Sequence, residues 1–222
     1  MTRWILAAAL ALTPLAGFAA EKAAEPPKKP EPPKEAKLPP GTYARLKTAK
    51  GEIVFRLLAD KAPKTVQNFV ELAKGERPWK DENGNWVAKP FYNGLTFHRV
   101  ENGALKLIQG GDPNGDGSGG PGYHFRDEID DSLNFDKPDV VAMANAGRNT
   151  NGSQFFITVS PAPSLNGRYS IFGELVAGLD VARAISEMPS TLRAGVHMAK
   201  EPVAIQSVTI EEVKEEAKPK GK

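Results

Sequence analysis

Short apolar runs separated by polar loops make up most of the chain between residues 41 and 213. Two of these runs, residues 42–47 and 52–57, flank Ala49-Lys50-Gly51 and predict a β-hairpin. Six further runs are typical of strands, at residues 96–100, 106–110, 140–144, 154–158, 171–175 and 203–213. Many short strands between loops rich in Gly, Pro and Asn predict a closed barrel or a sandwich rather than a parallel sheet.

Two segments have helical rather than strand periodicity. Pro63 opens the first, where its missing N–H costs nothing, and Gly75 ends it. The apolar stripe of this helix consists of Val66, Phe69, Val70 and Ala73. The second helix is expected at residues 179–186, before Pro189 stops it.

Residues 76–90 form an insertion between the first helix and the next strand. Trp79 and Trp86 flank Asn83-Gly84-Asn85, a pattern that predicts a small hairpin. Two interpretations stay open: a surface loop whose tryptophans cover the barrel edge, and a segment that takes part in substrate choice.

The two ends of the chain differ in composition from its middle. Arg3, an Ala/Leu-rich run at residues 4–16 and Gly17-Phe18-Ala19 are typical of an export signal that is cleaved after Ala19. The apolar run is shorter than the roughly 20 residues that span a bilayer, which argues against a membrane anchor. Pro, Lys and Glu dominate the stretch that follows, which predicts an extended linker.

These observations predict a signal peptide at residues 1–19, a linker at 20–40, one domain at 41–213 and a charged disordered tail at 214–222. We therefore expect an exported protein, periplasmic or extracellular, with no stable membrane insertion after cleavage.

Composition excludes several function classes. The 29 basic and 27 acidic residues leave a net charge of +2, too small for an electrostatic footprint of nucleic acid binding. The absence of cysteine excludes disulfides, thiol nucleophiles and cysteine-based zinc sites. His98, His124 and His197 are scattered, with no acid at metal-ligand spacing, so we expect neither a metal nor a cofactor.

The glycine-rich segment after residue 110 fits two binding patterns, and we reject both. Residues 115–120 match a dinucleotide fingerprint, but Pro121-Gly122 follow, so no helix begins there to receive a pyrophosphate. Residues 112–117 match the first half of a calcium loop, but Tyr123 stands where the closing acid is required. A flexible turn that lets Gln109 approach a ligand is the better interpretation.

Three ordered blocks carry the strongest functional signal. They are Phe97-His98-Arg99-Val100, then Ile108-Gln109-Gly110-Gly111-Asp112, then the stretch from Val141 to Thr158 that contains Ala144-Asn145-Ala146 and Gln154-Phe155-Phe156. In this order and spacing they resemble the cyclophilin family of peptidyl-prolyl isomerases, and the resemblance extends from about residue 41 to residue 213. It implies a mainly β fold, a closed eight-stranded antiparallel barrel with an α-helix over each open end.

The resemblance also implies roles for individual residues. By motif match the family's catalytic arginine falls on Arg99, and its substrate-binding residues fall on Gln109, Ala144, Asn145, Ala146, Gln154 and Phe156. Leu165 and Tyr169 follow from the segment 165–173, which resembles the family's last pocket segment.

Strand alternation adds two residues to this set. Phe97 is expected to share a face with Arg99, and Leu107 is expected to help Phe156 grip a proline ring. The intervening His98 should face away from Arg99, as a buried, hydrogen-bonded structural histidine.

The chain departs from the family pattern at three positions. Ser164 replaces a tryptophan and Tyr169 a histidine, and both predict weak binding of the inhibitor cyclosporin. Lys106 stands where the family has a phenylalanine, in a segment about two residues longer than usual. Because burying an unpaired ammonium is costly, Lys106 is expected to point to solvent while Leu107 and Phe156 supply the missing apolar contact.

Two functional classes follow. The first is an exported, monomeric peptidyl-prolyl cis-trans isomerase that acts on proline-containing segments of unfolded or flexible proteins and assists their folding. The second is a non-catalytic proline-peptide-binding module or chaperone. Arg99, Gln109, Gln154 and Phe156 together favour the enzyme.

Overall fold

The computed structural model describes residues 38–215. The expected signal peptide, most of the linker and all but two residues of the tail lie outside this range. No helix within it is long and apolar enough to cross a membrane.

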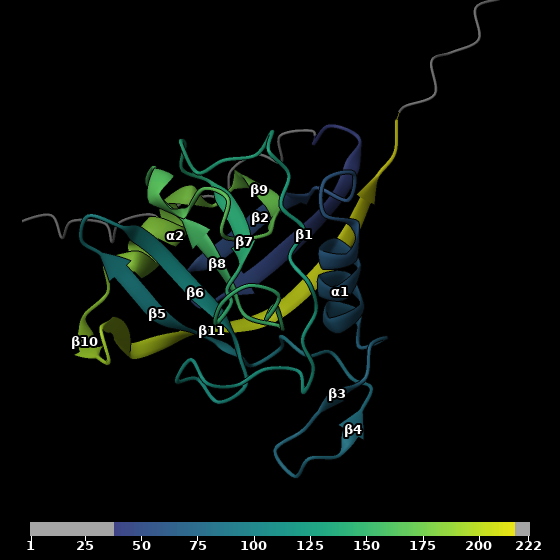
Figure 1. Ribbon diagram of the computed structural model, residues 1–222, viewed down its shortest axis with the longest axis horizontal. Helices are drawn as coiled ribbons and strands as arrows, with labels where there is room; N and C mark the ends of the chain where they lie inside the picture. Colours follow the sequence, from purple (N-terminus) through teal and green to yellow (C-terminus); the bar gives the residue numbers. More distant parts are fainter. Residues whose placement is uncertain (1–37, 216–222) are drawn as a thin grey trace, which may run out of the picture. The chain divides into compact units, whose positions relative to one another are not determined.

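Eight antiparallel strands close into a barrel (Figure 1). Around the barrel they are β1 (Gly41–Thr48), β2 (Gly51–Leu57), β9 (Ile171–Ala177), β7 (Val140–Met143), β8 (Phe155–Thr158), β6 (Lys106–Asp112), β5 (Thr96–Asn102) and β11 (Val196–Val213). Pairing of β1 with β11, from Gly41 opposite Val213 to Thr48 opposite Ile205, completes the ring. The predicted barrel is therefore confirmed, and the sandwich is excluded.

Two helices and several small elements complete the described fold: α1 (Pro63–Lys74), α2 (Leu179–Ser186), the 3₁₀ helix η1 (Pro163–Leu165), and the strands β3 (Trp79–Lys80), β4 (Trp86–Val87) and β10 (Ser190–Arg193). Helix α1 begins at Pro63 and ends at Gly75, whose φ of 77° lies in the left-handed region that glycine tolerates. Strands β3 and β4 form the small hairpin expected in the 76–90 insertion. The sequence did not predict β10 or the first residues of β11, which pair with each other beside β5.

Side chains from the two faces of the sheet form separate apolar clusters. The larger cluster fills the barrel with fully buried aromatic rings, among them Phe55, Phe69, Phe97, Phe155 and Phe172. The smaller cluster includes Leu107, Phe135, Ala142, Phe156 and Ile171. Because neighbours such as Phe155 and Phe156 alternate between the clusters, the smaller one lies on the outer face of the barrel.

An irregular register on β5 separates Phe97 from Arg99. Phe97 pairs with Gly110, whereas Arg99 pairs with Gln109, so one extra residue, His98, is accommodated between them. Both Phe97 and His98 are consequently buried, and the ring of Phe97 packs on Phe155 inside the barrel. The prediction that Phe97 shares a face with Arg99 is wrong, because it assumed an uninterrupted alternation.

Candidate active site

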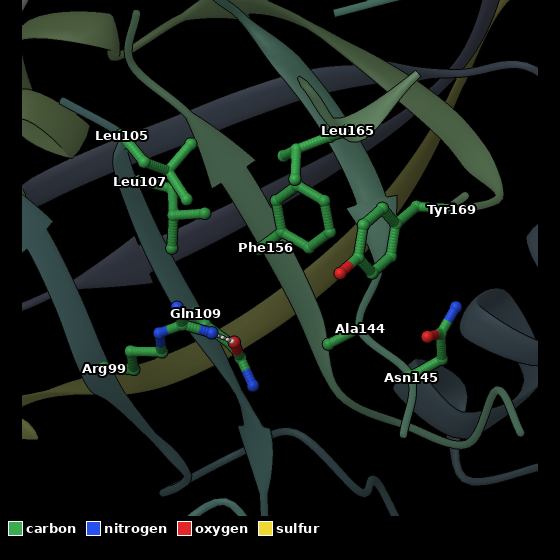
Figure 2. A pocket seen from close by; sticks show the side chains of 9 residues that line it. All are labelled: Arg99, Leu105, Leu107, Gln109, Ala144, Asn145, Phe156, Leu165 and Tyr169. Atoms are coloured by element: carbon green, nitrogen blue, oxygen red, sulfur yellow. Dashed lines mark hydrogen bonds between the residues drawn. The ribbon is translucent and has the colours of Figure 1, made fainter. Parts of the chain in front are cut away.

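The smaller apolar cluster, on the outer face of the barrel, borders a hollow of about 110 Å³. This hollow lies between β5, β6, β8 and the loops that follow β7 and η1 (Figure 2). Nine residues line it: Arg99, Leu105, Leu107, Gln109, Ala144, Asn145, Phe156, Leu165 and Tyr169. In Figure 2 the leucines and aromatic rings surround one part of the hollow, and Arg99 and Gln109 stand together at another. The hollow is thus apolar on one side and carries a cation and an amide on the other.

Phe156 forms the aromatic floor of the hollow. Its ring packs edge-on against Tyr169, with centroids 5.2 Å apart, and is stacked on Phe135 at 5.8 Å. Phe135 is fully buried behind it, and its backbone N–H donates to the Asn166 side chain at 2.7 Å. Phe156 is therefore fixed from two sides, because neither neighbouring ring can move without opening the outer cluster.

Two residues of this apolar wall were missed by sequence reasoning. Leu105 lines the hollow beside Leu107, and Phe135 supports Phe156 from behind. Leu105 stands two positions before Leu107, so strand alternation places both side chains on the same face. This could have been inferred from the sequence. Phe135 lies in a polar loop, and no local pattern indicates which ring it contacts.

Lys106 does not line the hollow. Its neighbours Leu105 and Leu107 do, and strand residues alternate between faces, so the lysine lies on the opposite face. The residue is partly buried, and the direction of its ammonium toward solvent stays a prediction. Leu105 adds a third apolar side chain to the lining formed by Leu107 and Phe156.

Arg99 is held by hydrogen bonds at two of its three guanidinium nitrogens. Its Nε donates to Glu101 Oε1 at 2.9 Å, and its Nη1 donates to Gln109 Oε1 at 3.1 Å. Within residues 38–215 no hydrogen bond is formed by Nη2. A planar guanidinium held at two nitrogens has a fixed plane, so the remaining N–H groups are available to a ligand in the hollow.

The amide of Gln109 continues this network to a second glutamine. Gln109 Nε2 donates to Gln154 Oε1 at 2.8 Å, and Gln154 Nε2 donates to the carbonyl oxygens of Gly117 and Gly119 at 3.0 and 2.8 Å. Both glutamine amides are oriented by these contacts. Gln154 does not line the first hollow and instead fixes the glycine-rich loop beside it.

That loop is folded around Asp112. The backbone N–H groups of Asn114, Asp116 and Gly117 all donate to the Asp112 carboxylate. An added Cβ at Gly119 would collide with this carboxylate, which would have to shift to admit any other residue. The segment that resembled a calcium loop thus uses its first acid to organise its own backbone, and no cluster of potential metal ligands exists among the described residues.

A second hollow of about 160 Å³ adjoins the first and shares Gln109, Ala144 and Asn145 with it. Ala146 and Gln154 line this second hollow, together with the loop 117–120. The Asn145 side chain donates to the Arg168 carbonyl at 3.2 Å and accepts from the Gly147 N–H, so it braces the loop between β7 and β8. The predicted site residues other than Phe97 therefore line two connected hollows.

His98 lies behind this site and has no part in it. It is 1 % exposed, and neither ring nitrogen has a hydrogen-bond partner among the described residues. Burial lowers the pKa of its imidazole, against an opposing influence of Asp112. The histidine is buried as expected, and the Thr96 backbone is near enough to favour the charged imidazole, although no contact of the ring has the geometry of a full hydrogen bond.

Comparison with known proteins agrees with this geometry. The family described as cyclophilin type peptidyl-prolyl cis-trans isomerase/CLD matches residues 43–215. Peptidyl-prolyl cis-trans isomerase B of Streptomyces anulatus is 51 % identical over 172 residues, which are 76 % of this chain and 96 % of that protein. Peptidyl-prolyl cis-trans isomerase A of Mycobacterium tuberculosis is 48 % identical over 168 residues, 75 % of this chain and 91 % of its own.

Solved structures show the same fold. A cyclophilin type isomerase of Cryptosporidium parvum superimposes with a TM-score of 0.65 at 33 % identity, covering 78 % of this chain and 98 % of its own. A crystal structure of that isomerase in the presence of the dipeptide Ala-Pro gives a TM-score of 0.64 at 34 % identity, with 77 % and 99 % covered.

Proposed function

The chain belongs to the cyclophilin-type peptidyl-prolyl cis-trans isomerases and is an enzyme of that class, and from this premise we propose how its site works and where it acts. Cyclophilins bind proline-containing peptides. We propose that the X–Pro bond of such a peptide is bound in the first hollow, with Arg99 as the catalytic residue.

The chemistry needs no nucleophile. Rotation about an X–Pro bond is slow because it breaks amide resonance, with a barrier of roughly 18–20 kcal/mol. When the bond is twisted, the proline nitrogen becomes pyramidal and regains a lone pair. A donor aimed at this nitrogen binds the twisted state more strongly than either planar state and so lowers the barrier.

The observation that carries the proposal is the state of the Arg99 guanidinium. Two of its nitrogens are fixed by Glu101 and Gln109, and the third has no hydrogen bond within residues 38–215 while the side chain lines the hollow. Arg99 thus offers a preoriented donor beside an apolar wall. Phe156, Leu105 and Leu107 would hold the proline ring against that donor, with Leu165 and Tyr169 closing the far side.

Residues flanking the proline would extend into the second hollow. Gln109 stands between the two hollows, and Ala144, Asn145 and Ala146 form one edge of the path between them. Because the Asn145 side chain is engaged by its own loop, the contact with a peptide would come from its main chain. One side of the X–Pro bond would then stay fixed while the other rotates.

We further propose that the enzyme is exported and acts as a monomer on unfolded or flexible proteins outside the cytoplasm. The signal-like pattern of residues 3–19 supports the export part of this proposal. N-terminal sequencing of the exported protein should find Ala20 as the first residue. Retention of Met1 in the mature protein, or its partition into membranes, would contradict export with cleavage.

A protease-coupled isomerase assay on a tetrapeptide that contains an Ala-Pro bond tests the catalytic part. The cis form should disappear faster in proportion to enzyme concentration. A protein that binds the peptide, as followed by NMR line broadening, yet leaves this rate unchanged would instead be a binding module.

A further inference from the structure

Glu101 is the most buried carboxylate that forms an ion pair in the part of the chain described. Its side chain is 13 % exposed, whereas those of Glu71, Asp130, Glu211 and Glu52 are 25–49 % exposed. It lies two residues after Arg99 on β5 and therefore on the same strand face. A carboxylate withdrawn this far from water is stable only if its partners are well placed.

Three contacts surround the Glu101 carboxylate. Oε1 accepts from Arg99 Nε at 2.9 Å and from the His197 backbone N–H at 3.2 Å. Oε2 lies 3.4 Å from His197 Nδ1. Because β5 and β11 pair at Arg99 and Met198, the long strand brings His197 to the back of the catalytic arginine.

We propose that Glu101 is a positioning residue for the isomerase reaction, an inference that rests on the proposed role of Arg99. Glu101 holds the Nε edge of the guanidinium, and Gln109 holds Nη1. These two contacts fix the plane of the fork and so determine where Nη2 points. His197 in turn holds Glu101, and the β10–β11 hairpin thereby becomes part of the catalytic apparatus without lining the hollow.

Glu101 could act through the position of its oxygen atoms or through its negative charge. A carboxylate beside Arg99 offsets part of the positive potential that the hollow would otherwise feel. If Glu101 acts through position, a neutral acceptor of the same shape should replace it. If it acted only as a counter-charge, the neutral acceptor should be as harmful as an apolar residue.

The test compares Glu101→Gln and Glu101→Leu in the tetrapeptide assay with separate kcat and KM. Glu101→Leu is expected to lower kcat roughly tenfold, because a small misplacement of a catalytic group is costly, and to leave KM within about twofold. Glu101→Gln is expected to stay within about threefold of wild type in kcat, because its amide oxygen can still accept from Arg99 Nε. The control is Glu211→Leu, which removes the carboxylate from the Nε of Arg45 and should leave kcat unchanged.

A second measurement is independent of turnover. The Arg99 Nε–H signal in ¹H–¹⁵N spectra should exchange slowly with water in the wild type and in Glu101→Gln, and should be lost in Glu101→Leu. Loss of this signal reports a loss of Arg99 orientation. Loss of folding is followed separately by the thermal midpoint of each variant.

Either of two results overturns the inference: wild-type kcat in a folded Glu101→Leu protein, or equal losses in Glu101→Leu and Glu101→Gln. Arg99→Ala is measured in parallel. If Arg99→Ala retains turnover, the proposed function fails, whereas an inactive Arg99→Ala beside an unaffected Glu101→Leu refutes only the role of Glu101.

Discussion

Two arginines on this barrel have equally exposed side chains and similar Nε ion pairs, but they differ in the partners of their other guanidinium nitrogens. Arg45 on β1 and Arg99 on β5 each have a side chain that is 25 % exposed, and each donates from Nε to a glutamate at 2.9 Å. Arg45, however, also donates from Nη1 to Glu52 and from Nη2 to Glu211, so all three nitrogens bind carboxylates. Arg99 binds one carboxylate and one neutral amide, and Nη2 has no hydrogen bond within residues 38–215.

The difference lies in the charge of the groups that hold each guanidinium. Two carboxylates raise the pKa of the Arg45 guanidinium, chiefly through the hydrogen bond to Glu211, and neutralise its field. The neutral amide of Gln109 orients Arg99 without adding a second negative charge. Exposure and the presence of an ion pair therefore do not separate these two arginines, whereas the number of guanidinium nitrogens without a hydrogen bond in the described residues does.

The sharpest test removes the guanidinium group of Arg99. Arg99→Ala should lower kcat by a factor of about 10² to 10⁴, the scale for loss of one preorganised donor to a developing lone pair. The fold should persist, because Arg99 is at the rim of the hollow and outside both apolar clusters. Near-wild-type turnover in a folded Arg99→Ala protein would remove the arginine from the mechanism.

A second test concerns the apolar wall that Arg99 faces. Leu105→Ala should raise KM for the peptide roughly fivefold, because a partly exposed leucine contributes about 1 kcal/mol when a ligand covers it, and should change kcat less. Lys106→Ala, next to it on the opposite strand face, is the matched control and should leave KM unchanged. A larger effect at Lys106 than at Leu105 would mean that the lysine, not the leucine, reaches the bound proline.

The third test asks whether Arg45 is only structural. Arg45→Met keeps the aliphatic part of the side chain and leaves Glu52 and Glu211 without their shared cation. Since both carboxylates are more than a third exposed, the loss should be about 1 kcal/mol or less, or about 2–4 °C in Tm. The kcat per folded molecule should equal that of the wild type, and a selective loss of kcat would refute the distinction between the two arginines.

The last test concerns His98, which lies beside Arg99 on β5 and should affect the pH dependence of stability rather than turnover. Burial lowers its pKa below the ordinary value of 6.5, so the unfolded chain takes up a proton at a pH at which the folded protein does not. Stability should therefore fall as the pH drops below about 6.5, with a slope from this residue of at most about 1.4 kcal/mol per pH unit. Urea titrations between pH 5 and 7 should show a shallower slope for His98→Gln, and an unchanged slope would exclude His98 as its source.

Much of the barrel could be predicted because the spacing of apolar residues and the residues that form turns depend only on the local sequence. The hairpin of β1 and β2, the helix from Pro63 to Gly75 and the strand that carries Gln109 all followed from apolar spacing and from Gly and Pro positions. The arginine, the amides and Phe156 followed from the resemblance of three short blocks, and the structure brings them to the two connected hollows.

Features that depend on register or on distant partners could not be predicted in this way. Phe97 was assigned to the wrong face because the extra residue on β5 becomes visible only when its pairing with β6 is known. Phe135 and His197 reach the site from loops and strands whose own patterns carry no sign of their partners. Glu101 looked like an ordinary polar strand residue for the same reason.

The seam between β1 and β11 has a consequence for the order in which the protein folds. Arg45 and Glu211, which pair across this seam, are 166 residues apart in the sequence. Contacts of such long sequence separation slow folding, because most of the chain must be ordered before they form. Since β11 also pairs with β5 at Arg99, the strand that carries this arginine gains one of its two neighbours only after β11 has been synthesised and docked. An enzyme for slow rotation about X–Pro bonds thus itself depends on a late step of its own folding.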